Sequence, residues 1–173
     1  FQVSVCSDSG VGGRFIDEES GVSVGSAGRD RVKFYISLNP GQEPQPLARI
    51  ASGGEISRIM LALKTVLADA DKVPVMIFDE IDHGISGRIA RVVGKNLRIN
   101  AEKRQIICIT HLPQIASLAE KHFRVKKVVE KGETETRIEE LTTEERVEEI
   151  ARLMGGEEVT DTTLRSAAEL IAD

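Results

Sequence analysis

Two short continuous apolar runs, each followed directly by polar residues, constrain the fold of this chain most. They cover residues 75–78 and 106–109, and neither run alternates with polar positions. Runs of this kind are typical of strands that are buried on both faces of a sheet. Residues 87–100 lie between the runs and repeat their apolar positions at helical spacing. A strand, a crossover helix and a second strand together predict an α/β fold with a parallel sheet.

The rest of the sequence divides into segments around this centre, and the length of 173 residues suits one domain, 1–173. We expect a strand and a flexible loop over 1–30, a strand and linker over 31–46, a core over 47–121, and a hairpin with closing helices over 122–173. Apolar alternation predicts a half-buried strand over 31–38, and helical periodicity predicts a helix over 55–70. The same signals predict a helix over 113–121, strands over 123–129 and 134–141, and helices over 143–154 and 160–172.

Charge and hydropathy exclude some classes of protein. The net charge is −5, so the chain lacks the strongly basic field of a typical nucleic-acid-binding domain. Any contact with DNA must therefore come from a local patch or from parts outside this sequence. Basic residues do gather near the hairpin, but we interpret them as a solvated face: Arg124, Lys126, Lys127 and Lys131. No apolar run approaches the roughly 18 residues of a membrane helix, so no membrane partner is expected.

The cysteines and the first residue also carry information. Cys6 and Cys108 are the only two cysteines and lie far apart in the sequence. We interpret both as reduced cytosolic thiols rather than as a disulfide or a metal pair. The chain begins at Phe1 and not at a methionine, so we expect it to be a piece of something longer.

A first candidate site lies at the start of the helix predicted over 55–70, in the stretch Ser52, Gly53, Gly54 and Glu55. Ser52 and Glu55 have the spacing of a capping box, but a capping box does not explain two glycines. Each glycine in a helix costs about 1 kcal/mol relative to alanine. Without their Cβ atoms, a ligand can lie against backbone N–H groups at the positive end of the helix dipole. A helix cap and a phosphate site both remain open on these residues alone.

A second candidate site follows the apolar run 75–78, where Asp79 and Glu80 stand side by side. A carboxylate such as Asp79 can hold Mg²⁺ through its water shell, and Glu80 can polarise or deprotonate an attacking water. The alternative is a strand that simply ends in an acidic turn.

His111 follows the second apolar run. Alone, such a histidine is more often a capping or packing residue. However, if the two strands are neighbours, Asp79, Glu80 and His111 share one rim of the sheet, where α/β proteins place their ligands. There, the histidine can hydrogen-bond a γ-phosphate.

In this order the features resemble the motifs of ABC-type ATPases, which are P-loop NTPases. Residues 52–55 match the signature motif, 77–80 the Walker B strand, His111 the switch histidine, and 81–87 the D-loop. The amino-acid sequence resembles the RecN family of SMC-related ATPases still more closely, over residues 46–64, 78–87, 110–116 and 146–156. The resemblance runs from about Val32 to the last residue.

This resemblance implies a function and a set of roles. RecN-like proteins are bacterial ATPases of DNA double-strand-break repair and recombination, and their heads bind ATP and Mg²⁺ between two copies. It implies that Ser52, Gly53, Gly54 and Glu55 serve the ATP of a partner head, with Asp82 also contacting the nucleotide. It implies that Asp79 serves Mg²⁺, and that Glu80 and His111 act catalytically on the ATP of their own head. A cytoplasmic, nucleoid-associated location follows from the same resemblance.

One departure from the family pattern matters for the domain organisation. No Gly-x-x-x-x-Gly-Lys-Ser/Thr motif occurs in these residues. We therefore expect the chain to be the C-terminal lobe of the head, with an N-terminal lobe of the same protein supplying the Walker A motif. This chain alone should be inactive, and DNA should be held by the complete protein. A chromosome-clamping SMC-like head, the nucleotide-binding domain of a transporter and a plain α/β binding module are the rival interpretations. Ser86, where transporters often have an aspartate, weakens the second of these.

Overall fold

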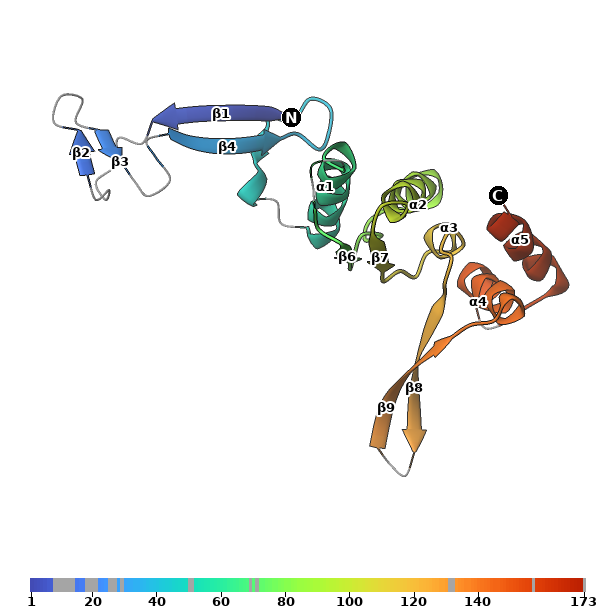
Figure 1. Ribbon diagram of the computed structural model, residues 1–173. Helices are drawn as coiled ribbons and strands as arrows, with labels where there is room; N and C mark the ends of the chain where they lie inside the picture. The colour runs from blue at the N-terminus through green and yellow to red at the C-terminus, as the bar shows by residue number, and fades with distance from the viewer. Residues whose placement is uncertain are drawn as a thin grey trace. The chain divides into compact units, whose positions relative to one another are not determined.

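The structure is a computed structural model that describes residues 1–7, 15–17, 22–24, 28, 30–49, 52–68, 70, 72–130, 133–156 and 158–172. The chain forms two compact units, Phe1–Ala51 and Ser52–Asp173, which we call the first and the second unit (Figure 1). The candidate site residues lie in the second unit.

The first unit is built from short antiparallel strands. β1 (Gln2–Ser7), β4 (Asp30–Ile36) and β5 (Gln45–Pro46) form one sheet in the order β1-β4-β5, followed by a 3₁₀ turn, η1 (Leu47–Arg49). β2 (Phe15–Asp17) pairs with β3 (Val22–Val24), and the remainder of the predicted flexible loop lies largely outside the described residues. The strand predicted over 31–38 is confirmed as β4, but its expected half-burial is wrong, because Val32 and Phe34 are exposed. The described part of this unit contains no α-helix or second sheet that covers them.

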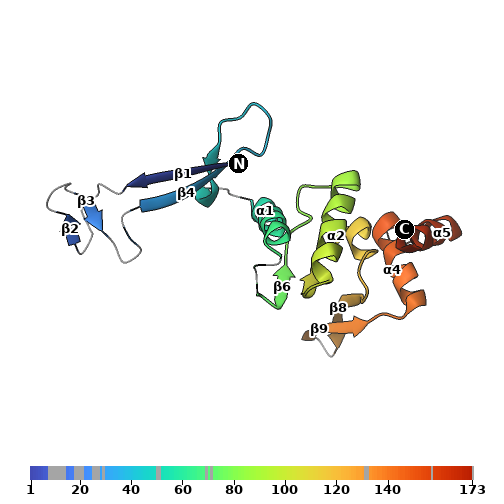
Figure 2. The same ribbon diagram turned by 45° about the horizontal axis from the view of Figure 1, so that its top comes forward.

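The second unit has the predicted α/β order. Its helices and strands are α1 (Gly53–Val66), β6 (Val75–Phe78), α2 (Gly87–Ala101), β7 (Gln105–Cys108), α3 (Pro113–Ala116), β8 (Phe123–Glu130), β9 (Glu133–Glu140), α4 (Thr143–Gly155) and α5 (Asp161–Ala172). β6 and β7 pair in parallel, and α2 lies between them in the chain as the crossover. Figure 2 shows α1, β6 and α2 of this part of the chain. The predicted parallel sheet with a crossover helix is therefore confirmed.

The main core of this unit lies between the two-stranded sheet and the helices α1, α2 and α3. Met76 and Phe78 of β6 pack there with residues of α1, α2 and α3: Leu61, Ala90, Val93, Leu97 and Ile115. Complete burial of a large apolar side chain contributes about 1.5–3 kcal/mol, so this cluster is the main source of stability for the sheet and its edges. A second cluster, with Ile150, Ala151 and Ala167, joins α4 to α5.

The prediction that the strands are buried on both faces is wrong for this chain. Met76 and Phe78 are buried, but Ile77 between them is 66% exposed. Ile107 of the neighbouring strand and Ile109, which follows that strand, are exposed as well. In a strand, successive side chains point to opposite faces, and the helices of the main core cover only one of them. Among the described residues, no second layer covers the other face.

Some predicted boundaries also move. α1 ends at Val66 instead of Ala70, and α3 spans only Pro113–Ala116 instead of reaching Lys121. The proline does open α3, as predicted. The hairpin and the two closing helices are confirmed, and a capping box of Thr142 and Glu145 fixes the start of α4. Both cysteines are free, as expected, and burial raises the pKa of Cys108 to about 12.

Candidate functional site

The candidate site begins where the two parallel strands end. Phe78 pairs with Cys108 in the register of β6 and β7, and the N–H of Ile109 donates to the carbonyl of Phe78 at 2.9 Å. Parallel strands present their carboxyl ends at the same edge of a sheet. Asp79 and His111, which follow these strands, therefore lie at one edge and not at opposite ones. This is the shared rim that the sequence predicted.

Residues 79–84, which we call the acidic loop, turn sharply after β6. The carboxylate of Asp79 accepts a hydrogen bond from the N–H of Glu80 at 2.9 Å, and the carbonyl of Glu80 accepts one from His83 at 2.9 Å. Glu80 has a φ of 56°, the only positive value for a non-glycine residue among those described. Ile81 is fully buried in the main core. The loop is thus anchored at Ile81 while Asp79 and Glu80 remain exposed.

The start of α1 lies directly against the acidic loop. Ser52 is the N-cap, and its hydroxyl accepts a hydrogen bond from the N–H of Glu55 at 3.4 Å. A Cβ on Gly53 would lie 2.5 Å from the Glu80 carboxylate, and one on Gly54 would lie 2.8 Å from the Glu80 carbonyl. The packing of the chain itself therefore requires Gly54, whereas the atom close to Gly53 is the end of a flexible side chain. Gly53 is exposed, whereas Gly54 is buried.

Two residues of α1 that sequence reasoning missed tie the helix to the acidic loop. Arg58 donates to the carbonyls of Ile81 and His83, at 3.0 and 2.8 Å. Ser57 donates to the carbonyl of Asp79 at 3.1 Å. The acceptors are backbone carbonyls more than 20 residues away in the sequence, so no side-chain pattern could have indicated these contacts. The start of α1, with Gly53 and Gly54, is therefore joined by hydrogen bonds to the loop that carries Asp79 and Glu80.

Asp82 connects the acidic loop to the second strand. Its side chain is 5% exposed, and one carboxylate oxygen accepts hydrogen bonds from the Thr110 hydroxyl at 2.6 Å and the His111 N–H at 2.9 Å. Burial alone would raise the pKa of Asp82, but the hydrogen bonds from Thr110 and His111 outweigh it and hold this pKa below its usual value. Asp82 is therefore an ionised, buried acceptor.

The same oxygen of Asp82 lies 3.0 Å from Nδ1 of His111. Because a carboxylate only accepts, this contact favours a proton on Nδ1, and Nε2 is then the nitrogen that faces a ligand. The His111 side chain is 75% exposed, so Nε2 can be reached from solvent. An oriented imidazole beside two exposed carboxylates can hydrogen-bond an anion or take part in proton transfer.

The acids do not form a metal site by themselves. Among the described residues, no group of three histidine, cysteine, aspartate or glutamate side chains is arranged to hold a metal ion. Mg²⁺ usually keeps several waters and binds through one or two carboxylates together with substrate phosphates. An exposed Asp79 fits that role, with the nucleotide and water as the remaining ligands.

Comparison with known proteins places this geometry in a class. No family model matches the chain. Among solved structures, it is similar to the Smc head domain with a coiled coil and joint from Pyrococcus yayanosii, with a TM-score of 0.52 and 17% identity. The match covers 96% of this chain and 26% of that one. The chain therefore has the fold of an Smc head domain, with a parallel α/β core.

The relatives are more specific. The chain is 48% identical to the DNA repair protein RecN of Haemophilus influenzae over 148 residues, 86% of this chain. It is 47% identical to RecN of Halalkalibacterium halodurans and 43% identical to RecN of Bacillus subtilis. The chain is therefore similar, over most of its own length, to one part of these RecN proteins. The chain spans about a quarter (26%) of the length of these relatives.

Proposed function

We propose that this chain is the C-terminal lobe of an ATP-hydrolysing head in a RecN-like protein of DNA double-strand-break repair and recombination. The observation that carries the proposal is the connection of three motifs at one edge. The acidic loop contacts the glycines of α1 on one side and holds His111 through Asp82 on the other. The similarity to proteins named DNA repair protein RecN supports DNA as the macromolecular partner. The resemblance of residues 52–55, 77–80 and His111 to ABC-type ATPase motifs supports ATP as the nucleotide.

We assign the roles by exposure and chemistry. Asp79 would hold Mg²⁺, and this ion when bound would neutralise charge on the phosphates. Glu80 is exposed at the edge of the sheet and would accept a proton from the attacking water. His111 would donate to a phosphate oxygen through Nε2 when its ring carries both protons, because the phosphate oxygen is an acceptor. Ser52, Gly53, Gly54 and Glu55 at the start of α1 would meet the nucleotide of a partner head, because a helix start with small residues suits phosphate oxygens.

Asp82 receives a different role from the one that the family resemblance implies. A nucleotide contact would need an accessible carboxylate, whereas Asp82 is buried and one of its oxygens is occupied by Thr110 and His111. We assign it as a positioning residue, which fixes the tautomer and direction of His111.

The proposal requires partners beyond this chain. An N-terminal lobe of the same protein would supply the Walker A motif, and a second identical head would complete the ATP site. DNA would be bound by the complete protein, in the bacterial cytoplasm at the nucleoid. This chain alone would hydrolyse no ATP.

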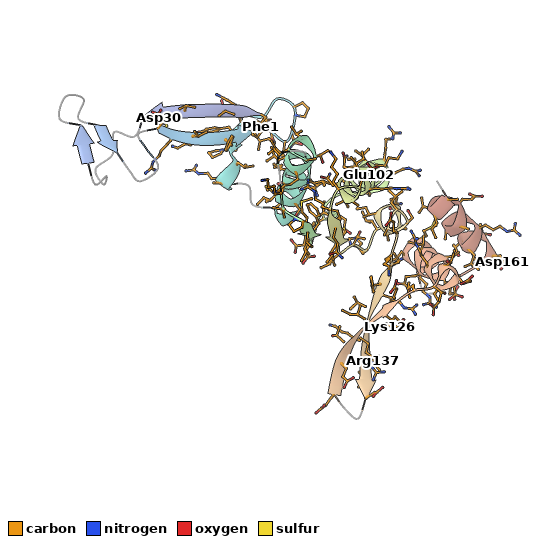
Figure 3. The ribbon with its side chains drawn as sticks, viewed as in Figure 1. Phe1, Asp30, Glu102, Lys126, Arg137 and Asp161 are labelled. Atoms are coloured by element: carbon orange, nitrogen blue, oxygen red, sulfur yellow. The ribbon has the colours of Figure 1, made fainter. Side chains whose placement is uncertain are left out.

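The sharpest test changes Glu80 to glutamine in the full-length protein. Loss of a general base typically costs 10²–10⁴ in rate, so turnover should fall about 100-fold or more while ATP still binds. Glu102→Gln is the matched control, because Glu102 is an exposed carboxylate at the C-cap of α2 (Figure 3). Steady-state ATPase assays and nucleotide titration measure the two effects. Undiminished turnover in Glu80→Gln would remove Glu80 from the mechanism.

A further inference from the structure

The charged side chains of α2 are all basic. Between Gly87 and Ala101, the helix carries four basic residues and no acidic one, in a chain with a net charge of −5. By contrast, α4 mixes both signs, with Glu144, Glu145, Glu148 and Glu149 beside two arginines. The basic residues of α2 form what we call the basic stripe: Arg88, Arg91, Lys95 and Arg98.

The basic stripe occupies one face of the helix. Its members are spaced by three or four residues, and positions at this spacing lie on one side of an α-helix. The opposite side is the core face, with Ala90, Val93, Gly94, Leu97 and Asn100 buried. At 1.5 Å per residue, the stripe from Arg88 to Arg98 is about 15 Å long. Side chains with nitrogen atoms at their tips extend outward from α2 in Figure 3.

Three of the four cations are available to a partner. Arg88, Lys95 and Arg98 are exposed, and within the described part of the chain none of them has a hydrogen bond or ion pair. Arg91 has an interaction of its own, so we do not count it. The argument therefore depends on three cations along about 15 Å of helix.

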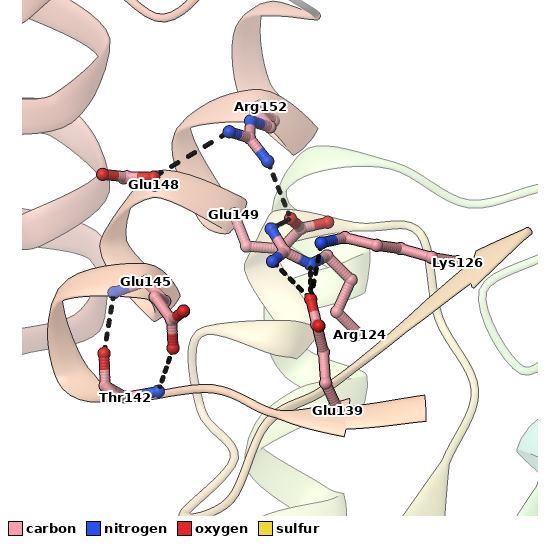
Figure 4. Close-up of polar contacts among 8 residues, drawn as sticks. All are labelled: Arg124, Lys126, Glu139, Thr142, Glu145, Glu148, Glu149 and Arg152. Carbon is pink, nitrogen blue, oxygen red and sulfur yellow. Dashed lines mark hydrogen bonds and ion pairs between the residues drawn. The ribbon is translucent and has the colours of Figure 1, made fainter. Parts of the chain in front are cut away.

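The other basic cluster of this unit, at the hairpin, is partly neutralised. Arg124 and Lys126 of the hairpin both pair with Glu139, and Arg124 also pairs with Glu149 at 3.1 Å (Figure 4). Arg137 pairs with Glu130 and Glu135 on the same face of the hairpin. Of the patch that the sequence singled out near the hairpin, Arg124 and Lys126 are thus paired within the chain. Lys127 is exposed without a hydrogen bond or ion pair among the described residues, and Lys131 lies outside them.

We infer that the basic stripe of α2 is a contact surface for the phosphate backbone of duplex DNA. The choice of DNA over other polyanions rests on the proposed function. Duplex DNA carries one negative charge per roughly 1.7 Å of its axis, so a row of three cations about 15 Å long always faces several phosphates. Contacts of this kind are independent of base sequence. They give an acidic chain local affinity for DNA without a basic field over the whole domain.

The test compares two charge-reversal variants of this chain. In the stripe variant, Arg88, Lys95 and Arg98 are replaced by glutamate. In the control variant, Arg49, Lys72 and Arg165 are replaced by glutamate; these are also exposed, also two arginines and a lysine, and have no partner among the described residues. Both variants change the net charge by the same amount. Binding to a fluorescent 30-base-pair duplex is measured by anisotropy at several salt concentrations, with circular dichroism to check folding.

We expect the stripe variant to bind at least about tenfold more weakly at low salt, and its slope of log K against log salt to fall by about three. The control variant should stay within about twofold of the original chain and keep its salt slope. Equal losses in both variants, or no binding by the original chain at low salt, would overturn the inference. Displacement of the duplex by polyglutamate at equal charge concentration would do the same, because the stripe would then bind any polyanion. These outcomes do not depend on ATP hydrolysis, so they are separate from the test of Glu80.

Discussion

Asp82 and His111 are 29 residues apart in the sequence, yet one carboxylate oxygen binds both the backbone and the ring of the histidine. A single buried acceptor can thus influence which ring nitrogen of an exposed histidine carries the proton. Because Nδ1 faces Asp82, only Nε2 is left for a ligand. The resemblance of the motifs implied that Asp82 contacts nucleotide; because Asp82 is buried, the proposed function gives it a positioning role instead.

Replacing Asp82 with alanine should change the tautomer of His111. Without its acceptor, Nδ1 should lose its preference for the proton, and the Nε2–H form should gain population. Long-range ¹H–¹⁵N correlation spectra of this chain, recorded well above the pKa of free imidazole, measure this directly. Thr110→Val is the control, because it removes a second donor to Asp82 but leaves the contact between the ring and the carboxylate. An unchanged tautomer in Asp82→Ala would show that the contact has no such role.

At the scale of elements, the junction of α1 and the acidic loop is the most constrained part of the site. The carbonyls of Glu80 and His83 come within 2.8 and 3.0 Å of where a Cβ on Gly54 would lie. At Gly53, the nearest atom belongs to the flexible end of the Glu80 side chain. The two glycines therefore tolerate substitution differently, although they are adjacent in the sequence.

Gly54→Ala should destabilise the chain, while Gly53→Ala should not. Forcing a methyl against two fixed carbonyls costs about 1–3 kcal/mol, which exceeds the gain of up to about 1 kcal/mol from helix propensity. In Gly53→Ala, the Glu80 side chain can rotate away at little cost. Urea unfolding of both variants gives the comparison. If the two variants lose the same stability, the close packing of the loop against α1 is not present in solution.

At the scale of the whole molecule, the stability of the second unit should depend on pH through His122, which precedes β8. Burial and the nearby Arg146 lower the pKa of His122 below 6.5, although Glu149 acts in the opposite direction. Its Nδ1 is buried without a hydrogen-bond partner in the described structure. Folding therefore favours the neutral ring, and the unfolded chain binds the proton more tightly. This contribution to stability is present above the unfolded pKa and is lost as the pH falls below it toward the folded pKa.

His122→Gln should reduce this pH dependence. The free energy of unfolding of the original chain should fall between pH 7.5 and 5.5, and the variant should show a smaller fall over the same range. Urea unfolding at a series of pH values measures both slopes. His83→Gln serves as the control, because His83 is exposed in the acidic loop. A slope that His122→Gln leaves unchanged would mean that another group titrates in this range.

The described part of the chain also leaves apolar surface uncovered. Ile77, Ile107 and Ile109 are exposed on one face of β6 and β7, and no helix of the described residues is long and apolar enough to cross a membrane. The chain spans about a quarter (26%) of the length of its RecN relatives. Under the proposed function, these strands would belong to a larger sheet in the complete head.

Local sequence patterns were enough to predict most helices and strands of the second unit. Apolar runs and helical periodicity predicted β6, α2 and β7 in order, their parallel pairing, the hairpin and the two closing helices, because backbone preference and side-chain periodicity act over a few neighbouring residues. From the parallel pairing it also followed that Asp79 and His111 share an edge.

Two features depend on the tertiary structure and not on local sequence: which faces of the sheet are covered, and which residues far apart in the sequence are in contact. The alternation of Met76 and Ile77 between buried and exposed depends on which layers pack against the sheet. The contacts of Arg58 with the acidic loop and of Asp82 with His111 join atoms 23 to 29 residues apart in the sequence. Local sequence patterns do not indicate such contacts, because these contacts form only when separate helices, strands and loops pack against one another.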